Sequence, residues 1–117
     1  MARDGSRVFI VEDEIILSLE LDGRLGCLIA GRAASLHDAL GKADRLDFDL
    51  AIVDLELGRQ SGEPVIEAVT RRRIPMIITS GYDLPQAHAR HKLLPKPYTL
   101  EDLRLAVDCA LSGGHRQ

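Results

Sequence analysis

The sequence contains 117 residues, the size of one domain when a typical domain has about 150. Its 15 basic and 18 acidic side chains give a net charge of −3, whereas general nucleic-acid binders carry a basic excess. Aromatic residues make up 3% of the chain and tryptophan is absent, which leaves too few rings for a base-stacking surface. Hydrophobic residues reach 45%, enough for a core. These figures exclude a general nucleic-acid binder and an intrinsically disordered chain.

Apolar stretches are too short for a membrane span. The longest uncharged stretch near the middle of the chain is 74–82, against about 20 residues for a transmembrane helix. The apolar run 8–11 near the N-terminus is followed at once by acidic residues, unlike the apolar segment of a signal peptide. We therefore expect a single cytoplasmic domain over 1–117 with no membrane partner.

Cysteines and histidines give no metal-site pattern. Cys27 and Cys109 lie far apart in the sequence and are expected to be reduced thiols. His88 and His91 have the spacing of two metal ligands, but no cysteine or further histidine lies near them in the sequence. We therefore expect no metal site at these four residues.

Short apolar runs alternate with amphipathic stretches along the chain. The apolar runs predict buried strands, in chain order, at 8–11, 28–34, 50–53, 76–78 and 93–94. Residues at helical spacing predict helices over 15–25, from Ser35, after the glycine-bearing loop 58–62 with Pro64 in the first turn, and from Thr99. Little room remains between the last two strands, so the fourth helix is expected to be shortened.

Local signals mark the ends of the predicted helices. Ser35 with Asp38, and Thr99 with Asp102, have the spacing of a capping box. The arginine run 71–73 closes the third helix, where it complements the helix dipole and is expected to face water. A flexible tail is expected over 112–117, after a core of about 6–111.

Five strand–helix units in succession predict the fold class. Alternating units of this kind form a parallel sheet with helices on both faces. We therefore predict an α/β domain with a doubly wound, five-stranded parallel sheet of the flavodoxin-like (βα)₅ type. Ligands of such sheets bind at the carboxyl ends of the strands.

Polar residues follow four of the predicted strands at this edge. Glu12 and Asp13 come after the first strand, Asp54 after the third, Thr79 after the fourth and Lys96 after the fifth. These strands are close neighbours in a flavodoxin-like sheet, so the side chains are expected to converge. The convergence brings three carboxylates, a hydroxyl and an ammonium group to one edge.

The three carboxylates repel one another unless a cation offsets their charge. Two unit charges 4 Å apart repel by about 4 kcal/mol at an effective dielectric constant of 20. Mg²⁺ binds one or two carboxylates together with water and phosphate oxygens, and a lysine adds a fixed positive charge. Such a site suits phosphoryl transfer, which depends on positioning and charge neutralisation.

Four motifs resemble those of the receiver domains of bacterial two-component response regulators. They are VFIVEDE with Glu12 and Asp13, AIVDLEL with Asp54, MIITSGY with Thr79, and LLPKPY with Lys96. The motifs occur in the family's order at the ends of the expected strands, and the similarity covers about 6–111. The chain is therefore similar to a stand-alone receiver that has no output domain.

The resemblance implies a role for each residue of the site. Asp54 would accept the phosphoryl group as an aspartyl phosphate. Mg²⁺ would be the cofactor, bound directly by Asp13 and Asp54, by Glu12 mostly through water, and by the backbone carbonyl of Glu56. Thr79 would donate a hydrogen bond to the phosphoryl group after transfer.

The resemblance also assigns the lysine motif and the switch region. Lys96 would pair with the phosphoacceptor and then with the phosphoryl group. The bond before Pro97 would be cis, as is usual in receivers. Many receivers carry an aromatic switch residue three positions before the lysine, where this chain has Leu93. Its tyrosines are instead Tyr98 and Tyr82, which are therefore switch candidates.

The string around Thr79 resembles the FAT GUY subgroup of receivers, although Ser80 is inserted before Gly81. Members of that subgroup lack the usual aromatic residue and take phosphate from histidine kinases of the HWE or related class. Coupling between Thr79 and an aromatic ring is thus not expected here. We hypothesise that the segment 81–94, beginning at the flexible Gly81, is the mobile element instead.

The implied function is that of a signalling domain rather than an enzyme. A histidine kinase or a phosphotransfer protein would supply the phosphoryl group to Asp54, and the signal would leave by contact with a downstream protein target. Two alternatives stay open. One is a degenerate receiver that binds its partner without phosphorylation. The other is a small Mg²⁺-dependent phosphatase, although such enzymes typically carry a second aspartate where this chain has Glu56.

Overall fold

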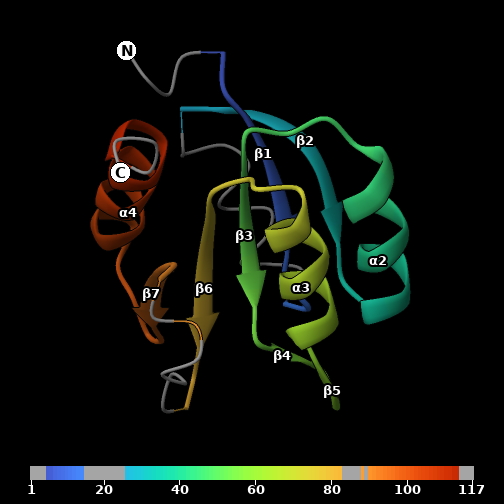
Figure 1. The fold of residues 1–117 in the computed structure, drawn as a ribbon. Helices are drawn as coiled ribbons and strands as arrows, with labels where there is room; N and C mark the ends of the chain where they lie inside the picture. The colour runs from blue at the N-terminus through green and yellow to red at the C-terminus, as the bar shows by residue number, and fades with distance from the viewer. Residues whose placement is uncertain (1–4, 15–25, 83–87, 89, 114–117) are drawn as a thin grey trace.

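The computed structural model describes residues 5–14, 26–82, 88 and 90–113 (Figure 1). Five strands form one sheet: β1 (Arg7–Val11), β2 (Leu28–Ala33), β3 (Leu50–Asp54), β6 (Met76–Ser80) and β7 (Lys92–Pro95). The described helices are α2 (Leu36–Arg45), α3 (Glu63–Arg71) and α4 (Leu100–Gly113). The five predicted strands are confirmed, with ends that differ by no more than two residues.

The sheet has the strand order β2-β1-β3-β6-β7, and every pairing in it is parallel. Helices α2 and α3 cover one face and α4 covers the other (Figure 1). This arrangement confirms the predicted doubly wound, flavodoxin-like fold. It also places the ends of β1, β3, β6 and β7 side by side at one edge.

Alternation along the central strands builds the two halves of the core. In β1, Phe9 and Val11 pack with α2 and α3, whereas Val8 and Ile10 pack with α4. All four side chains have no exposed surface. Because successive side chains of a strand point to opposite faces, the continuous apolar run is explained by burial on both faces.

Both predicted capping boxes begin helices. Ser35 Oγ accepts a hydrogen bond from the Asp38 N–H at 3.2 Å at the start of α2. At the start of α4, Thr99 Oγ1 accepts from the Asp102 N–H at 2.9 Å, and Asp102 Oδ2 accepts from the Thr99 N–H at 3.0 Å. The reciprocal pair satisfies two backbone donors that a helix leaves free at its start.

The end of α4 corrects one prediction. The helix continues to Gly113, so Ser112 and Gly113 belong to it rather than to a flexible tail. Ser112 Oγ donates to the Asp108 carbonyl at 2.6 Å, which is a contact typical of a helical serine. The rest of the expected tail, 114–117, lies outside the described residues. No helix within the described ranges combines the length and apolar character needed to cross a bilayer.

Two predicted helices lie partly or wholly outside the described residues. The helix expected over 15–25 is one of them. The shortened fourth helix is the other, since 83–87 and 89 fall in the span between β6 and β7. A hairpin that the sequence analysis treated as a loop does form after β3, from β4 (Glu56–Leu57) and β5 (Gln60–Ser61).

Arg72 corrects the expectation that the arginine run faces water. Its Nη1 donates to the carbonyl oxygens of Ala43 at 2.5 Å and Leu46 at 3.0 Å. The guanidinium group also lies 4.9 Å from the centre of the Phe48 ring. Arg72 therefore satisfies backbone acceptors at the end of α2 and ties this helix to the end of α3.

Candidate functional site

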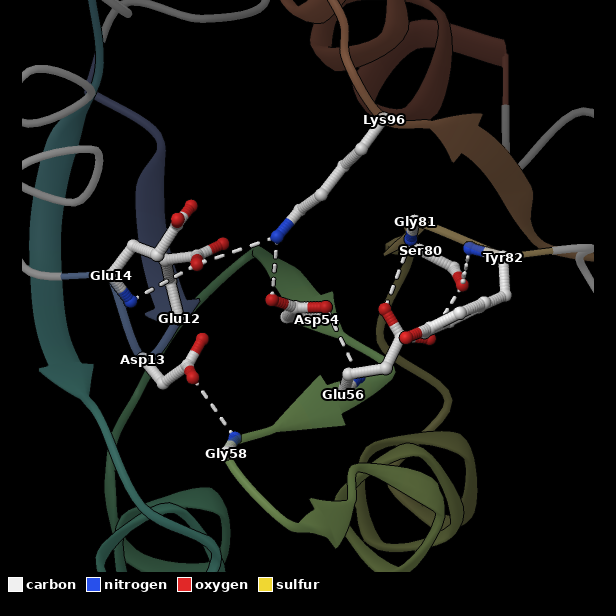
Figure 2. Close-up of polar contacts among 10 residues, drawn as sticks. All are labelled: Glu12, Asp13, Glu14, Asp54, Glu56, Gly58, Ser80, Gly81, Tyr82 and Lys96. Atoms are coloured by element: carbon white, nitrogen blue, oxygen red, sulfur yellow. Dashed lines mark hydrogen bonds and ion pairs between the residues drawn. The ribbon is translucent and has the colours of Figure 1, made fainter.

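The polar residues predicted at the strand ends come together in one site (Figure 2). Asp54 is the last residue of β3, and its register partner in β6 is Thr79. Glu12 follows β1 directly, and Lys96 follows β7. The parallel order of these strands is what brings residues from four distant parts of the sequence to the same edge.

Three carboxylates form the acidic part of the site. Ligand oxygens of Glu12, Asp13 and Asp54 all lie within 4.8 Å of one another. Glu12 and Asp54 are only 5% and 1% exposed. Asp13 lies nearer to solvent, and its Oδ2 accepts a hydrogen bond from the Gly58 N–H at 2.9 Å. Gly58 has a φ of 62°, a conformation that favours glycine, so the hairpin turn can present its N–H to Asp13.

Lys96 supplies the positive charge. Its Nζ lies 2.7 Å from Asp54 Oδ2 and 3.5 Å from Glu12 Oε2. Burial opposes the charge of the ammonium group, but the hydrogen bond to Asp54 and the charges of Asp54 and Glu12 outweigh it and raise the lysine pKa. Lys96 therefore stays protonated at neutral pH. The Lys96–Pro97 peptide bond is cis.

Burial dominates the protonation of the two inner carboxylates. It raises the pKa of Glu12 to about 7, and the negative charge of Asp54 adds to this effect while Lys96 opposes it. Burial also raises the pKa of Asp54, although hydrogen bonds from Lys96 and from the Glu56 N–H lower it. The site is thus short of positive charge in the absence of a cation, because a single lysine faces three carboxylates.

This donor set fits the magnesium ion that the fold implies. Mg²⁺ prefers hard oxygen ligands and one or two carboxylates, and the cluster offers oxygens from three within a short distance. The raised pKa of Glu12 follows first from its burial and then from the charge of Asp54, and a bound cation would offset both.

Two buried hydroxyl groups near this edge have no hydrogen-bond partner among the described residues, those of Thr79 and Tyr98. Thr79 is 1% exposed and lies beside Asp54 in the sheet register. Burial and the charge of Glu12 raise the pKa of Tyr98 to about 12, so its hydroxyl stays protonated. A buried hydroxyl without a partner loses free energy unless a ligand satisfies it.

Glu56 makes contacts beyond its expected role. The family resemblance implies a part in metal binding for its backbone carbonyl only. In the structure, its N–H donates to Asp54 Oδ1 at 3.1 Å, and its carboxylate points to the end of β6. There it accepts hydrogen bonds from Ser80 Oγ at 2.5 Å and from the Gly81 N–H at 3.0 Å (Figure 2). Sequence reasoning missed this contact, since no spacing rule links a hairpin residue to the next strand.

Of the two tyrosine switch candidates, Tyr82 lies at the surface, whereas Tyr98 is half-buried and packs against the core on the α4 side. Tyr82 is 76% exposed, and its N–H donates to Ser80 Oγ at 3.0 Å. Leu93, at the position of the usual aromatic residue, is half-buried and packs against the core on the α2 and α3 side. A ring that moves between two environments is therefore absent from that position.

The two histidines contact α3 separately. His88 Nε2 lies 2.8 Å from Glu63 Oε1, and His91 Nε2 lies 3.3 Å from Thr70 Oγ1. The Thr70 hydroxyl donates to the Ile66 carbonyl at 2.7 Å, so it accepts from His91. Burial lowers the pKa of His91, with Arg90 adding to the effect.

Several solved structures with this fold are receiver domains. The sequence matches no family model, and no curated protein sequence matches it. The solution structure of the PhyR response regulator REC domain of Erythrobacter litoralis is 27% identical, with a TM-score of 0.79 over 95% of this chain and 93% of that one. SdrG of Sphingomonas melonis is 26% identical, with a TM-score of 0.78 over 95% and 98%.

A more distant match has the same architecture. A CheY-like response regulator receiver domain protein of Methanospirillum hungatei is 21% identical, with a TM-score of 0.79 over 94% of this chain and 96% of that one. At this identity the likeness concerns the fold. Taken with the two nearer matches, it identifies the chain as a domain with the response regulator receiver fold.

Proposed function

We propose that this domain accepts a phosphoryl group on Asp54, supplied by a histidine kinase or a phosphotransfer protein, and signals by contact with a downstream protein. One observation carries the proposal. The Asp54 carboxylate is held between Lys96 Nζ at 2.7 Å and the Glu56 N–H at 3.1 Å, next to two further carboxylates. A buried carboxylate held at both oxygens is positioned to react rather than to bridge two surface groups.

Asp54 would act as the nucleophile. One of its carboxylate oxygens forms the new bond to phosphorus while the bond from phosphorus to the donor histidine nitrogen breaks. The bonding electrons leave with that nitrogen, so no group other than phosphoryl is transferred. The protonated Lys96 offsets the negative charge that gathers on the phosphoryl oxygens.

Glu12, Asp13 and Asp54 would hold a magnesium ion, together with the backbone carbonyl of Glu56. When bound, the ion supplies neutralising charge to the carboxylates and to the phosphoryl oxygens. Asp13, the more accessible of the three carboxylates, is kept in place by its hydrogen bond from Gly58. The buried Glu12 stays close to Lys96.

The Thr79 hydroxyl would donate to the new phosphoryl group. It is buried and has no partner among the described residues, so a phosphoryl oxygen would satisfy it. The phosphoryl oxygens of the aspartyl phosphate carry about two negative charges beside it, and charge-assisted hydrogen bonds are stronger than neutral ones.

We also propose that the domain belongs to the FAT GUY subgroup and takes phosphate from a kinase of the HWE or related class. The string from Thr79 to Tyr82 and the aliphatic Leu93 support this assignment.

The phosphatase alternative is less well supported. In that reading the residue two positions after Asp54 would act at the nucleophile, yet the Glu56 carboxylate is occupied by Ser80 and Gly81. A receiver that never accepts phosphate is also less well supported, because the complete acidic site with its lysine is present.

The experiment is intact-protein mass spectrometry after incubation with acetyl phosphate and Mg²⁺. Wild type should gain one phosphoryl group, and Asp54→Asn should gain none. Asp49→Asn is a matched control: this exposed aspartate directly precedes β3, at the end of the strand opposite Asp54, and its carboxylate accepts a hydrogen bond from the Arg7 N–H at 2.8 Å. The variant should behave as wild type. A phosphoryl group on Asp54→Asn would contradict the proposal.

A further inference from the structure

The end of β6 is held by a single carboxylate. Glu56 Oε2 accepts from Ser80 Oγ at 2.5 Å, and Glu56 Oε1 accepts from the Gly81 N–H at 3.0 Å. Ser80 Oγ accepts in turn from the Tyr82 N–H at 3.0 Å. We call these residues, Glu56, Ser80, Gly81 and Tyr82, the β6 clamp; Figure 2 shows them on the side of Asp54 away from Glu12.

The polar groups of the β6 clamp form their hydrogen bonds with one another. Ser80 has no exposed surface, so water does not compete for its hydroxyl. Both oxygens of the Glu56 carboxylate are used, and hydrogen bonds to a charged acceptor are the stronger kind. The contact therefore defines how the chain leaves β6.

The clamp is connected to the site at two points. The N–H of Glu56 donates to Asp54 Oδ1, so the residue that holds the clamp also holds the phosphoacceptor. The carbonyl of Ser80 accepts from the Lys96 N–H at 2.7 Å, so Ser80 also fixes the backbone of the lysine. Asp54 is therefore linked to the clamp directly through Glu56, and through Lys96 to Ser80.

We propose that Glu56 is a positioning residue that couples Asp54 to Tyr82, and that a phosphoryl group on Asp54 loosens its hold on Ser80 and Gly81. This inference rests on the proposed function of Asp54 as phosphoacceptor and adds the route by which its state reaches the surface. It gives the Glu56 side chain a role apart from the expected role of its backbone carbonyl.

The physical reason is the change in charge next to Glu56. The phosphoryl oxygens carry about two negative charges in place of the single charge of the Asp54 carboxylate, so about one further negative charge lies two positions from Glu56 and repels its carboxylate. It also alters the oxygen atoms of Asp54, one of which accepts the Glu56 N–H in the free protein. The two states thus interact differently with Glu56, as any ligand-driven change requires.

Tyr82 is the surface end of this route. Large hydrophobic side chains that are exposed within the described residues are Leu28, Tyr82 and Leu105. Of these three, Tyr82 belongs to the β6 clamp, through the hydrogen bond from its N–H to Ser80 Oγ. A partner that contacts the Tyr82 ring would therefore meet a surface whose position depends on Glu56.

The test measures amide exchange of Gly81 and Tyr82 with water by NMR in the presence of Mg²⁺, with and without beryllofluoride as a phosphoryl mimic. Occupancy at Asp54 is followed separately through the amide signals of Asp54 and Leu55. In wild type the mimic should speed exchange of the Gly81 amide about tenfold, the size expected for loss of one hydrogen bond to a charged acceptor.

Two variants remove the clamp in different ways. Ser80→Ala removes the hydroxyl that Glu56 and Tyr82 share, and Glu56→Gln replaces one of the two acceptor oxygens by a donor. The Tyr82 amide in Ser80→Ala and the Gly81 amide in Glu56→Gln should already exchange fast. On adding the mimic, each rate should change less than about twofold. Glu67→Gln, an exposed carboxylate on α3, should respond as wild type.

The outcomes separate the inference from the function on which it rests. If Asp54 and Leu55 respond to the mimic while Gly81 and Tyr82 do not, the coupling is wrong and the proposed function stands. The coupling is also wrong if both variants respond as strongly as wild type. If the mimic leaves Asp54 and Leu55 unchanged, the proposed function itself fails and the inference falls with it.

Discussion

Lys96 Nζ lies 2.7 Å from Asp54 Oδ2, although the strands that lead to the two residues are not neighbours in the sheet. Asp54 ends β3, Lys96 follows β7, and β6 lies between them in the sheet. The ammonium group therefore extends across the end of β6, where Thr79 and Ser80 are placed. This ion pair joins the residue that ends β3 to the residue that follows β7.

Removing the ammonium group should weaken both the fold and the reaction. In Lys96→Met the buried Asp54 loses its charged partner, so the free energy of unfolding at neutral pH should fall by about 2 kcal/mol. Phosphoryl incorporation from acetyl phosphate should slow about 100-fold, as for loss of one group that stabilises transferred charge. Lys92→Met, which removes an exposed lysine from β7, is the control and should change neither quantity.

The two effects of Lys96→Met are measured by urea unfolding and by the rate of mass increase. An unchanged rate with normal stability would mean that Lys96 has no part in the transfer.

Thr79→Val should separate the reaction from stability. The variant keeps the shape of the side chain and removes a buried hydroxyl that has no partner among the described residues. Urea unfolding should give a stability equal to wild type or higher by up to about 1 kcal/mol. Phosphoryl incorporation, or the lifetime of the adduct, should fall by about tenfold, because the phosphoryl group loses one donor. A stability loss without a change in the reaction would refute the role given to Thr79.

The raised pKa of Glu12 predicts how stability depends on pH. Between about pH 4.5 and about pH 7 the folded protein keeps a proton on Glu12 that the unfolded chain has lost. The free energy of unfolding should therefore decrease as pH rises through this range when no divalent cation is present. Glu12→Gln removes this contribution and should be more stable than wild type at about pH 8, by at most about 3 kcal/mol.

Magnesium provides the check on that prediction. A bound cation offsets the charge of the ionised cluster, so saturating Mg²⁺ should raise the stability of wild type at about pH 8. The gain should be smaller in Glu12→Gln, which has lost one carboxylate. Denaturant unfolding of wild type and Glu12→Gln at about pH 5 and about pH 8, with and without Mg²⁺, measures these free energies of unfolding. A wild-type stability that rises with pH in metal-free buffer would contradict the account.

Gly62 should tolerate no side chain. A Cβ there would collide with the backbone carbonyl oxygen of Asp54. The next nearest atoms, of Asp54 and Leu55, are also main-chain atoms, which cannot move aside as a side chain could. Gly62→Ala should therefore lower stability by about 1–3 kcal/mol and disturb phosphoryl incorporation. Gly41→Ala is the matched control, since nothing lies within 4 Å of the added Cβ in α2, and it should stabilise by up to about 1 kcal/mol. Thermal unfolding of both variants distinguishes these outcomes.

The fold and the site backbone could be predicted from the sequence because they depend on short-range patterns. Apolar runs such as 50–53 mark strands buried on both faces, and the capping signals at Ser35 and Thr99 mark helix starts. Once the strands are parallel, the residues after them must meet at one edge, which is how Asp54 and Lys96 could be placed in one site in advance, whereas their pairing is implied by the family resemblance.

The features that could not be predicted depend on which distant partner a side chain reaches in the folded structure. The Glu56 carboxylate points to Ser80, and Arg72 turns inward to the end of α2. Both residues are charged, and charged side chains are mostly exposed. In the packed structure, however, both form hydrogen bonds with buried or backbone groups that are distant in the sequence. The lack of a partner for the Thr79 hydroxyl is likewise a property of three-dimensional packing.

The central claim is that Asp54, and no other residue, carries the phosphoryl group. The most direct measurement is borohydride reduction of the phosphorylated protein, which converts an aspartyl phosphate to homoserine, followed by peptide mass spectrometry. The account predicts homoserine at position 54 in wild type and at no position in Asp54→Asn. A phosphoryl group located on His88 or His91, or homoserine at a position other than 54, would contradict it.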